Sequence, residues 1–133
     1  MPPLSYWYVR TAMVYLVTGL TLGMLLLTHK GVPLHPALWR LLPAHIEFLL
    51  LGWTLQFALG IAYWILPRFG SRRGNVRLAV LAFWLLNGGV WLTVCGYWFS
   101  GQWGLIELGR TLEAGAAATF VVHAWPRIKP LGA

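Results

Sequence analysis

Two histidines at the ends of neighbouring apolar runs are the residues whose type and spacing suggest chemistry. His29 closes the run that ends in LLLTHKG, and His45 opens the run AHIEFLLLGW. A neutral imidazole is a common axial ligand of heme iron; two from facing helices suit electron transfer, and one alone leaves the iron open to a small gas. The two histidines lie on the same side of the predicted bundle, so their spacing is compatible with a heme site that His45 and His29 share. Interfacial histidines without a ligand are the alternative.

Charged residues inside the apolar runs form the second group of candidates. All three acids of the chain, Glu47, Glu107 and Glu113, lie there together with Arg110, and charges at membrane depth are costly enough to be functional candidates. Arg110 either forms an internal ion pair with a glutamate or neutralises an anionic ligand group, and Glu47 is placed to meet either. Arg40 and Arg110 are the predicted partners of heme propionates.

Composition indicates the elements that must position these residues. The chain of 133 residues is 59% hydrophobic and 10% charged, which leaves too little polar surface to cover a soluble globule. Four apolar runs, near residues 8–28, 43–66, 76–99 and 103–125, each approach the ~20 residues that cross a bilayer as a helix. Strands of a membrane β-barrel are shorter and alternate in polarity. We predict an all-α fold, an integral membrane four-helix bundle that forms a single domain over residues 1–133.

The basic residues predict the orientation of this bundle. Four spans place the N-terminus, the loop between the second and third spans and the C-terminus on one side, and that side carries most of the positive charge. Its residues are Arg10, Arg68, Arg72, Arg73, Arg77, Arg127 and Lys129, against Lys30 and Arg40 on the other. The positive-inside rule then makes both termini cytoplasmic, in a multi-pass protein of the cell inner (plasma) membrane. The basic run RFGSRRGNVR lies between spans, so we expect lipid and no nucleic acid as its partner.

Aromatic and small residues mark faces for packing. Trp84, Trp91 and Trp98 recur every seven residues and share one helix face, which can pack on a partner subunit, on lipid or on a flat ligand. Small residues let another helix or a flat group approach closely. They are Gly19, Gly23, Gly52, Gly60, Ala114, Gly115 and Ala118. Such faces on a bundle this small predict a homo-oligomer.

The second apolar run also carries a resemblance to a known family. HIEFLLLGWTLQFALGIAYWILPRF resembles the second transmembrane helix of the catalytic subunit in the heme-copper oxidase superfamily, and its nitric oxide reductase branch most of all. A histidine opens that helix and a Gly-x-x-Tyr ending with a later proline closes it; the matching residues here are His45, Gly60, Tyr63, Trp64 and Pro67. The resemblance implies that His45 is an axial ligand of a low-spin heme. The ending Pro67, Arg68, Phe69 is also similar to that of small four-span relatives of this region.

The resemblance covers about one helix, and the chain departs from the family within it. The family's second ligand to that heme comes from a later helix, so here we expect it from His29, then His35, or from another subunit. Glu47 stands where the family has an asparagine. His123, at the other end of the last run, lies too far from His45 to share a metal with it inside one subunit.

Two functions therefore compete. The first is a heme b protein of the oxidase subunit I-like type, acting in electron transfer or in binding of nitric oxide or O2, with a respiratory complex or redox partner and no terminal oxidase activity of its own. The second is a cofactor-free accessory or assembly subunit of a respiratory oxidase or nitric oxide reductase complex, docking through its tryptophan face. Whether the protein is an enzyme is left open.

Overall fold

The chain is a bundle of four long helices, and it is all-helical over the residues that the computed structural model describes, 1–99 and 102–128. Lys129, counted above among the basic residues, lies outside this range. Helix α1 spans Pro3–Gly31. The second helix spans Pro36–Ile65 and has four parts: η1 (Pro36–Leu41, a 3-10 helix), α2 (Leu42–Glu47), η2 (Phe48–Leu55, a π-helix) and α3 (Gln56–Ile65). Then follow α4 (Val76–Trp98), α5 (Trp103–Ala124) and the 3-10 turn η3 (Trp125–Arg127).

Local sequence signals account for the helix ends. Pro3 and Pro36 begin α1 and η1, where a missing N–H costs nothing. The Asn75 side chain accepts a hydrogen bond from the Arg77 N–H at 3.2 Å and so caps α4. Pro67 follows the last residues of α3 and stops that helix. Gly74, with φ of 69°, supplies a left-handed conformation in the loop before α4.

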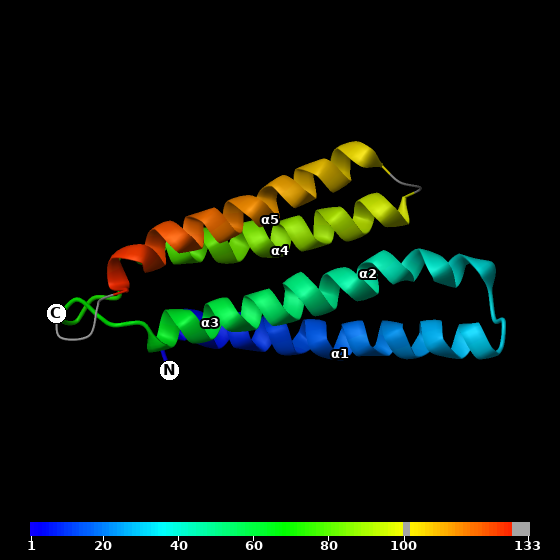
Figure 1. The fold of residues 1–133 in the computed structure, drawn as a ribbon, viewed down its shortest axis with the longest axis horizontal. Helices are drawn as coiled ribbons and strands as arrows, with labels where there is room; N and C mark the ends of the chain where they lie inside the picture. Colours follow the sequence, from blue (N-terminus) through cyan, green and yellow to red (C-terminus); the bar gives the residue numbers. More distant parts are fainter. Residues whose placement is uncertain (100–101, 129–133) are drawn as a thin grey trace.

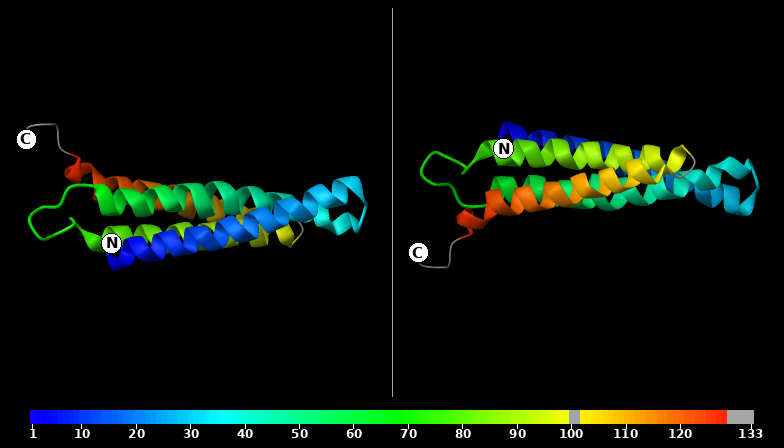
Figure 2. Two further views of the ribbon diagram at one scale, coloured as in Figure 1. Left: turned by 90° about the horizontal axis from the view of Figure 1, so that it is seen from below. Right: turned by 90° about the horizontal axis from the view of Figure 1, so that it is seen from above.

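The four helices form two hairpins that lie side by side (Figure 1). The first hairpin is α1 with the second helix, and the second hairpin is α4 with α5. The N-terminus, the loop between α3 and α4, and η3 lie at the same end of the bundle, which we call the N-terminal end. At the opposite end, the turn between α1 and η1 extends beyond the neighbouring ends of α4 and α5 (Figure 2).

Three of these helices, α1, the second helix and α4, are long and apolar enough to cross a membrane. Their surfaces fit that role, since large apolar side chains such as Val17, Leu27 and Trp84 are exposed on the outside of the bundle. The chain is therefore a membrane protein. Helix α5 is 22 residues long and carries Glu107, Arg110 and Glu113, which lower its apolar character.

Glycines bring the helices of each hairpin close together. A methyl group built on Gly52 would lie 2.6 Å from the Tyr15 ring, and one on Gly60 would lie 2.6 Å from the Cβ of Tyr8. In the second hairpin a methyl on Gly89 would lie 2.8 Å from the carbonyl oxygen of Gly109. Close approach of backbones through small residues is how helices associate in lipid.

Of the small residues predicted for α5, Gly115 is half-buried and faces Leu85 of α4, but the two alanines do not pack. Ala114 and Ala118 are exposed, while Gly109 and Ala116 face α4 or the core. On α1 and the second helix, by contrast, Gly19, Gly23, Gly52 and Gly60 all contact the other helix of the hairpin. Their predicted role in helix packing is confirmed.

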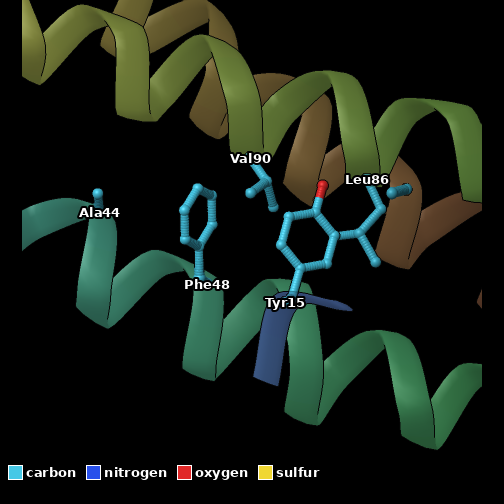
Figure 3. Close-up of a cluster of buried hydrophobic side chains, with 6 residues drawn as sticks. Tyr15, Ala44, Phe48, Leu86 and Val90 are labelled. Carbon is cyan, nitrogen blue, oxygen red and sulfur yellow. The ribbon is translucent and has the colours of Figure 1, made fainter. Parts of the chain in front are cut away.

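The core between the hairpins is formed by aromatic and aliphatic side chains (Figure 3). Tyr15 and Phe48 of the first hairpin face Leu86 and Val90 of the second, with the two aromatic ring centroids 5.3 Å apart. Hydrogen bonds cross the same layer: the Tyr15 hydroxyl donates to Asn87 Oδ1 at 2.9 Å, and Asn87 Nδ2 donates to Gln56 Oε1 at 2.9 Å. This polar chain fixes the register of one hairpin on the other.

Candidate functional site

His45 lies in α2 with its ring against the backbone of α1. Its Nδ1 is 2.7 Å from the carbonyl oxygen of Gly19, and because a carbonyl oxygen can only accept, Nδ1 carries the hydrogen. The neutral ring then has its lone pair on Nε2, which is the nitrogen left for a metal. A methyl built on Gly23 would lie 2.5 Å from Cε1 of the ring, so this glycine is what lets the imidazole pack against α1.

His29 is engaged separately, in the turn that ends α1. Its Nδ1 accepts the backbone N–H of Leu34 at 3.0 Å, and its ring packs edge-on against Trp39 with centroids 5.6 Å apart. The neutral ring therefore carries its hydrogen on Nε2 and is held as a cap of the turn. His35 has a similar local role, because its Nδ1 accepts the N–H of Ala37 at 3.1 Å.

The residues predicted to bind a heme differ in how well the structure places them for that role. His45 has the tautomer that an axial ligand requires, whereas His29 would first have to give up its hydrogen bond to the turn. Arg40 is exposed and lines a cavity of about 350 Å³ together with Phe48, Trp91 and Trp98. Within residues 1–99 and 102–128, no three histidine, cysteine or acidic side chains gather as a set of metal ligands.

Arg110 joins the two hairpins through the Glu47 carboxylate and also binds Glu113 of its own helix. Its Nη2 is 2.8 Å from Glu47 Oε2 and its Nη1 is 3.0 Å from Glu47 Oε1, a bidentate pair between α5 and α2. The same Nη1 is 2.9 Å from Glu113 Oε2, one turn along α5. The Thr93 hydroxyl of α4 donates to Glu113 Oε1 at 3.0 Å. Of the two roles predicted for Arg110, the structure therefore shows the internal ion pair, with Glu47 as the partner across the hairpins.

A small cavity opens onto this ion cluster. Its volume is about 210 Å³, and Leu42, Pro43, Ile46 and Tyr97 line it beside Glu47 and Arg110. The Glu47 and Glu113 side chains are only 3% and 6% exposed, whereas the Arg110 side chain is 45% exposed. Glu107 is exposed on α5, and its carboxylate forms no ion pair with the described part of the chain.

A further buried cluster, at the N-terminal end, was not predicted from the sequence. The Arg127 side chain is fully buried, and its guanidinium donates to the carbonyl oxygens of Tyr63, Leu66 and Pro67 at 3.0, 2.7 and 3.0 Å. These carbonyls have no partner inside α3 because the helix ends there. Arg127 therefore caps the second helix with a positive charge. Burial lowers the pKa of this guanidinium from its ordinary value, and the neighbouring Arg73 lowers it further.

His123 belongs to this cap. Its Nδ1 lies 2.9 Å from the carbonyl oxygen of Asn75 and donates to it, and its Nε2 accepts from Arg127 Nη1 at 2.8 Å. Both ring nitrogens are thus occupied, and the ring stacks on Tyr63 with centroids 5.4 Å apart. The signal for this cluster in the sequence is weak: it is the interval of four residues between His123 and Arg127, which places them on one side of a helix turn.

Searches against family models, curated proteins and solved structures find no match for the chain. The similarity of the second helix to the oxidase superfamily therefore remains a prediction.

Proposed function

We propose that the protein is a membrane heme b protein of the heme-copper oxidase subunit I-like type, with His45 as the axial ligand. In this proposal α5 crosses the bilayer as the fourth span, beside α4, and both termini are cytoplasmic. The observation that supports the ligand is the hydrogen bond from His45 Nδ1 to the Gly19 carbonyl, which leaves Nε2 as the acceptor. Metal-binding histidines usually donate their second ring N–H to a carbonyl or carboxylate in this way.

Ligation by one histidine supports gas binding over electron transfer. His29 holds the turn after α1 through its own Nδ1, so it is not free to act as the second ligand. Heme with a single protein ligand supplies an iron position that a diatomic gas such as nitric oxide or O2 can take. In this proposal Arg40, rather than Arg110, pairs with a propionate, because Arg110 is already bound to Glu47 and Glu113.

An absorption spectrum of the detergent-purified protein, oxidised and reduced, tests this proposal. We expect a heme b spectrum that His45→Ala abolishes and that His29→Ala and His35→Ala leave intact. We also expect the reduced form to shift on addition of carbon monoxide, because one iron position is open. A six-coordinate spectrum that both His45→Ala and His29→Ala abolish would instead support an electron carrier. Protein that stays colourless after incubation with hemin would contradict the proposal.

The second candidate is a cofactor-free accessory or assembly subunit of a respiratory oxidase or nitric oxide reductase complex. The observation in its favour is that Trp84, Trp91 and Trp98 are 67%, 54% and 47% exposed along one side of α4. Tryptophan is enriched where proteins bind one another, although a lipid interface also favours it. The hemin experiment separates the two functions, since this candidate predicts no bound chromophore and an unchanged fold.

A further inference from the structure

A cavity of about 700 Å³ opens at the N-terminal end of the bundle, beside the loop between α3 and α4. Its walls come from the start of α1, the last turn of α3, the loop, and the first turn of α4. Three arginines line it, Arg72, Arg73 and Arg77. Two backbone hydrogen bonds between Phe69 and Arg72, at 2.8 and 3.0 Å, hold the loop in a tight turn. We call this space the arginine cavity.

The three arginines of the arginine cavity differ in what they bind. Arg73 Nη1 donates to the carbonyl oxygens of Tyr63 and Trp64 at 3.3 and 3.0 Å, which holds its guanidinium at the end of α3. Arg72 and Arg77 are exposed, and their side chains form no hydrogen bond or ion pair with residues 1–99 and 102–128. Two guanidinium groups are therefore available to a ligand, next to a third whose position is fixed.

The chain does not balance this positive charge with acidic side chains of its own. It has only three acids. Glu47 and Glu113 bind Arg110, and Glu107 lies in the second turn of α5, at the opposite end of the bundle. The buried Arg127 adds a further positive charge at the N-terminal end, where its partners are carbonyl oxygens and a neutral imidazole. Because clustered or buried cations are costly without an anion, we expect the anion to come from outside the chain.

The level of the arginine cavity in the membrane indicates what that anion is. The cavity lies between the ends of the second helix and α4, which are both long and apolar enough to cross a bilayer. Exposed indole rings, which favour the headgroup region, lie at the same end of the bundle. They belong to Trp7, Trp64 and Trp125. The lipid headgroups are therefore the anions nearest to the cavity.

We propose that the arginine cavity binds the phosphate group of an anionic phospholipid, with Arg72 and Arg77 as its charged ligands and Arg73 beside them. A guanidinium presents a planar fork of N–H donors that matches the oxygens of a phosphate. This is a defined site and more than attraction of a basic loop to a lipid surface, because Arg68 of the same loop does not line it. The site does not depend on bound heme.

Lipid titration of the protein in a neutral detergent, followed by native mass spectrometry, tests the site. We expect phosphatidylglycerol to bind at about tenfold lower concentration than phosphatidylcholine, whose choline cation opposes the arginines. The double variant Arg72→Gln, Arg77→Gln should weaken phosphatidylglycerol binding about 30-fold, because two cations leave the cavity. Arg68→Gln is the matched control: it removes the same charge from the loop outside the cavity and should change binding by less than about twofold.

Inorganic phosphate, added in competition with phosphatidylglycerol, distinguishes the source of the phosphate group. Displacement of the lipid at equal concentration would keep the phosphate site and assign it to a soluble ligand. Equal binding of the two lipids would overturn the proposal, and so would equal losses in Arg68→Gln and the double variant. Circular dichroism shows whether each variant keeps its helices. If the double variant unfolds, Arg77→Gln alone provides the same comparison with Arg68→Gln.

Discussion

Gly88 and Gly89 are neighbours in α4, yet the packing requires only one of them. A methyl built on Gly89 would lie 2.7 Å from Glu113 Cγ and 2.8 Å from the Gly109 carbonyl oxygen. A methyl on Gly88 would meet nothing nearer than Leu112 Cδ1, at 4.0 Å. Gly89 is therefore one of the glycines, with Gly96 and Gly109, that let α4 and α5 approach closely, and it is the one of them that contacts Glu113.

Alanine substitutions at these two positions should have opposite effects. Gly89→Ala should destabilise the protein by about 1–3 kcal/mol, because the methyl forces two backbones apart. Gly88→Ala should be neutral or stabilise it by up to about 1 kcal/mol, because alanine favours the helix and meets no obstacle. Thermal unfolding in detergent, followed by circular dichroism, measures both. Equal destabilisation by the two variants would contradict the role given to Gly89.

The sequence was informative about single residues and less so about their partners. Glu47, Arg110 and Glu113 could be recognised as candidates because charges in apolar runs are rare. That Arg110 contacts both acids depends on how α2 lies against α5, and no local signal specifies that contact. The hydrogen bond between His45 and Gly19 was hidden for the same reason, since the two residues meet only when α1 and α2 pack.

At the scale of elements, the second helix contains a feature that the apolar pattern did not predict. Its buried residues recur every four positions, at Phe48, Gly52, Gln56 and Gly60. Because an α-helix has about 3.6 residues per turn, residues four apart gradually move around its surface and would leave a common face. The π-helix η2 joins residue i to i+5 and so takes up one extra residue. It keeps Phe48, Gly52 and Gln56 on the face that meets α1 and α4.

Removing one exposed residue from η2 should therefore be tolerated. Deletion of Leu50 gives Phe48, Gly52 and Gln56 an i, i+3, i+7 spacing, which an ordinary α-helix places on one face. Deletion of Leu81, an exposed leucine of the α-helix α4, should instead turn one half of that helix by about 100° and unfold the protein. Gel filtration and thermal unfolding compare the two. If both deletions unfold the protein, the π-helix does not have this role.

Helix positions were predicted well and helix ends less well. The runs near 76–99 and 103–125 agree with α4 and α5 within about a residue, because Asn75 and the polar residues between the runs give clear stops. The run near 8–28 is part of a longer α1, Pro3–Gly31, and the run near 43–66 lies within a second helix that begins at Pro36. Apolar character marks the part of a helix that meets lipid, and a helix continues beyond it where capping allows.

At the scale of the whole molecule, the two ends of the bundle differ in charge. The loop between α3 and α4 carries Arg68, Arg72 and Arg73, while the opposite end carries Lys30 in the last turn of α1 and Arg40 in η1. The positive-inside rule then predicts that the loop is cytoplasmic and the turn is outside. Gly31 and Ser71 are exposed representatives of the two ends, and a methyl built on Gly31 meets nothing within 4 Å.

Cysteine labelling at these two positions tests the orientation. In a Cys95→Ala background, we expect Gly31→Cys to react with a membrane-impermeant maleimide added to intact cells. Ser71→Cys should react only after the membrane is permeabilised. The reverse pattern would place both termini outside, and reaction of both cysteines in intact cells would contradict a bundle in which α1 and the second helix both cross the bilayer.

The division into two hairpins has a consequence for biogenesis. Each hairpin holds together through glycine contacts, but the Glu47 carboxylate and the side-chain oxygen of Gln56 in the first find their partners, Arg110 and Asn87, only in the second. The first hairpin is also synthesised first. Until the second hairpin is inserted, the first hairpin has no such partner for this carboxylate or for this amide oxygen, and lipid supplies none. A nascent or truncated chain therefore keeps unpaired polar groups within the membrane. Membrane chaperones and proteases can recognise these groups, and pairing with the second hairpin removes them.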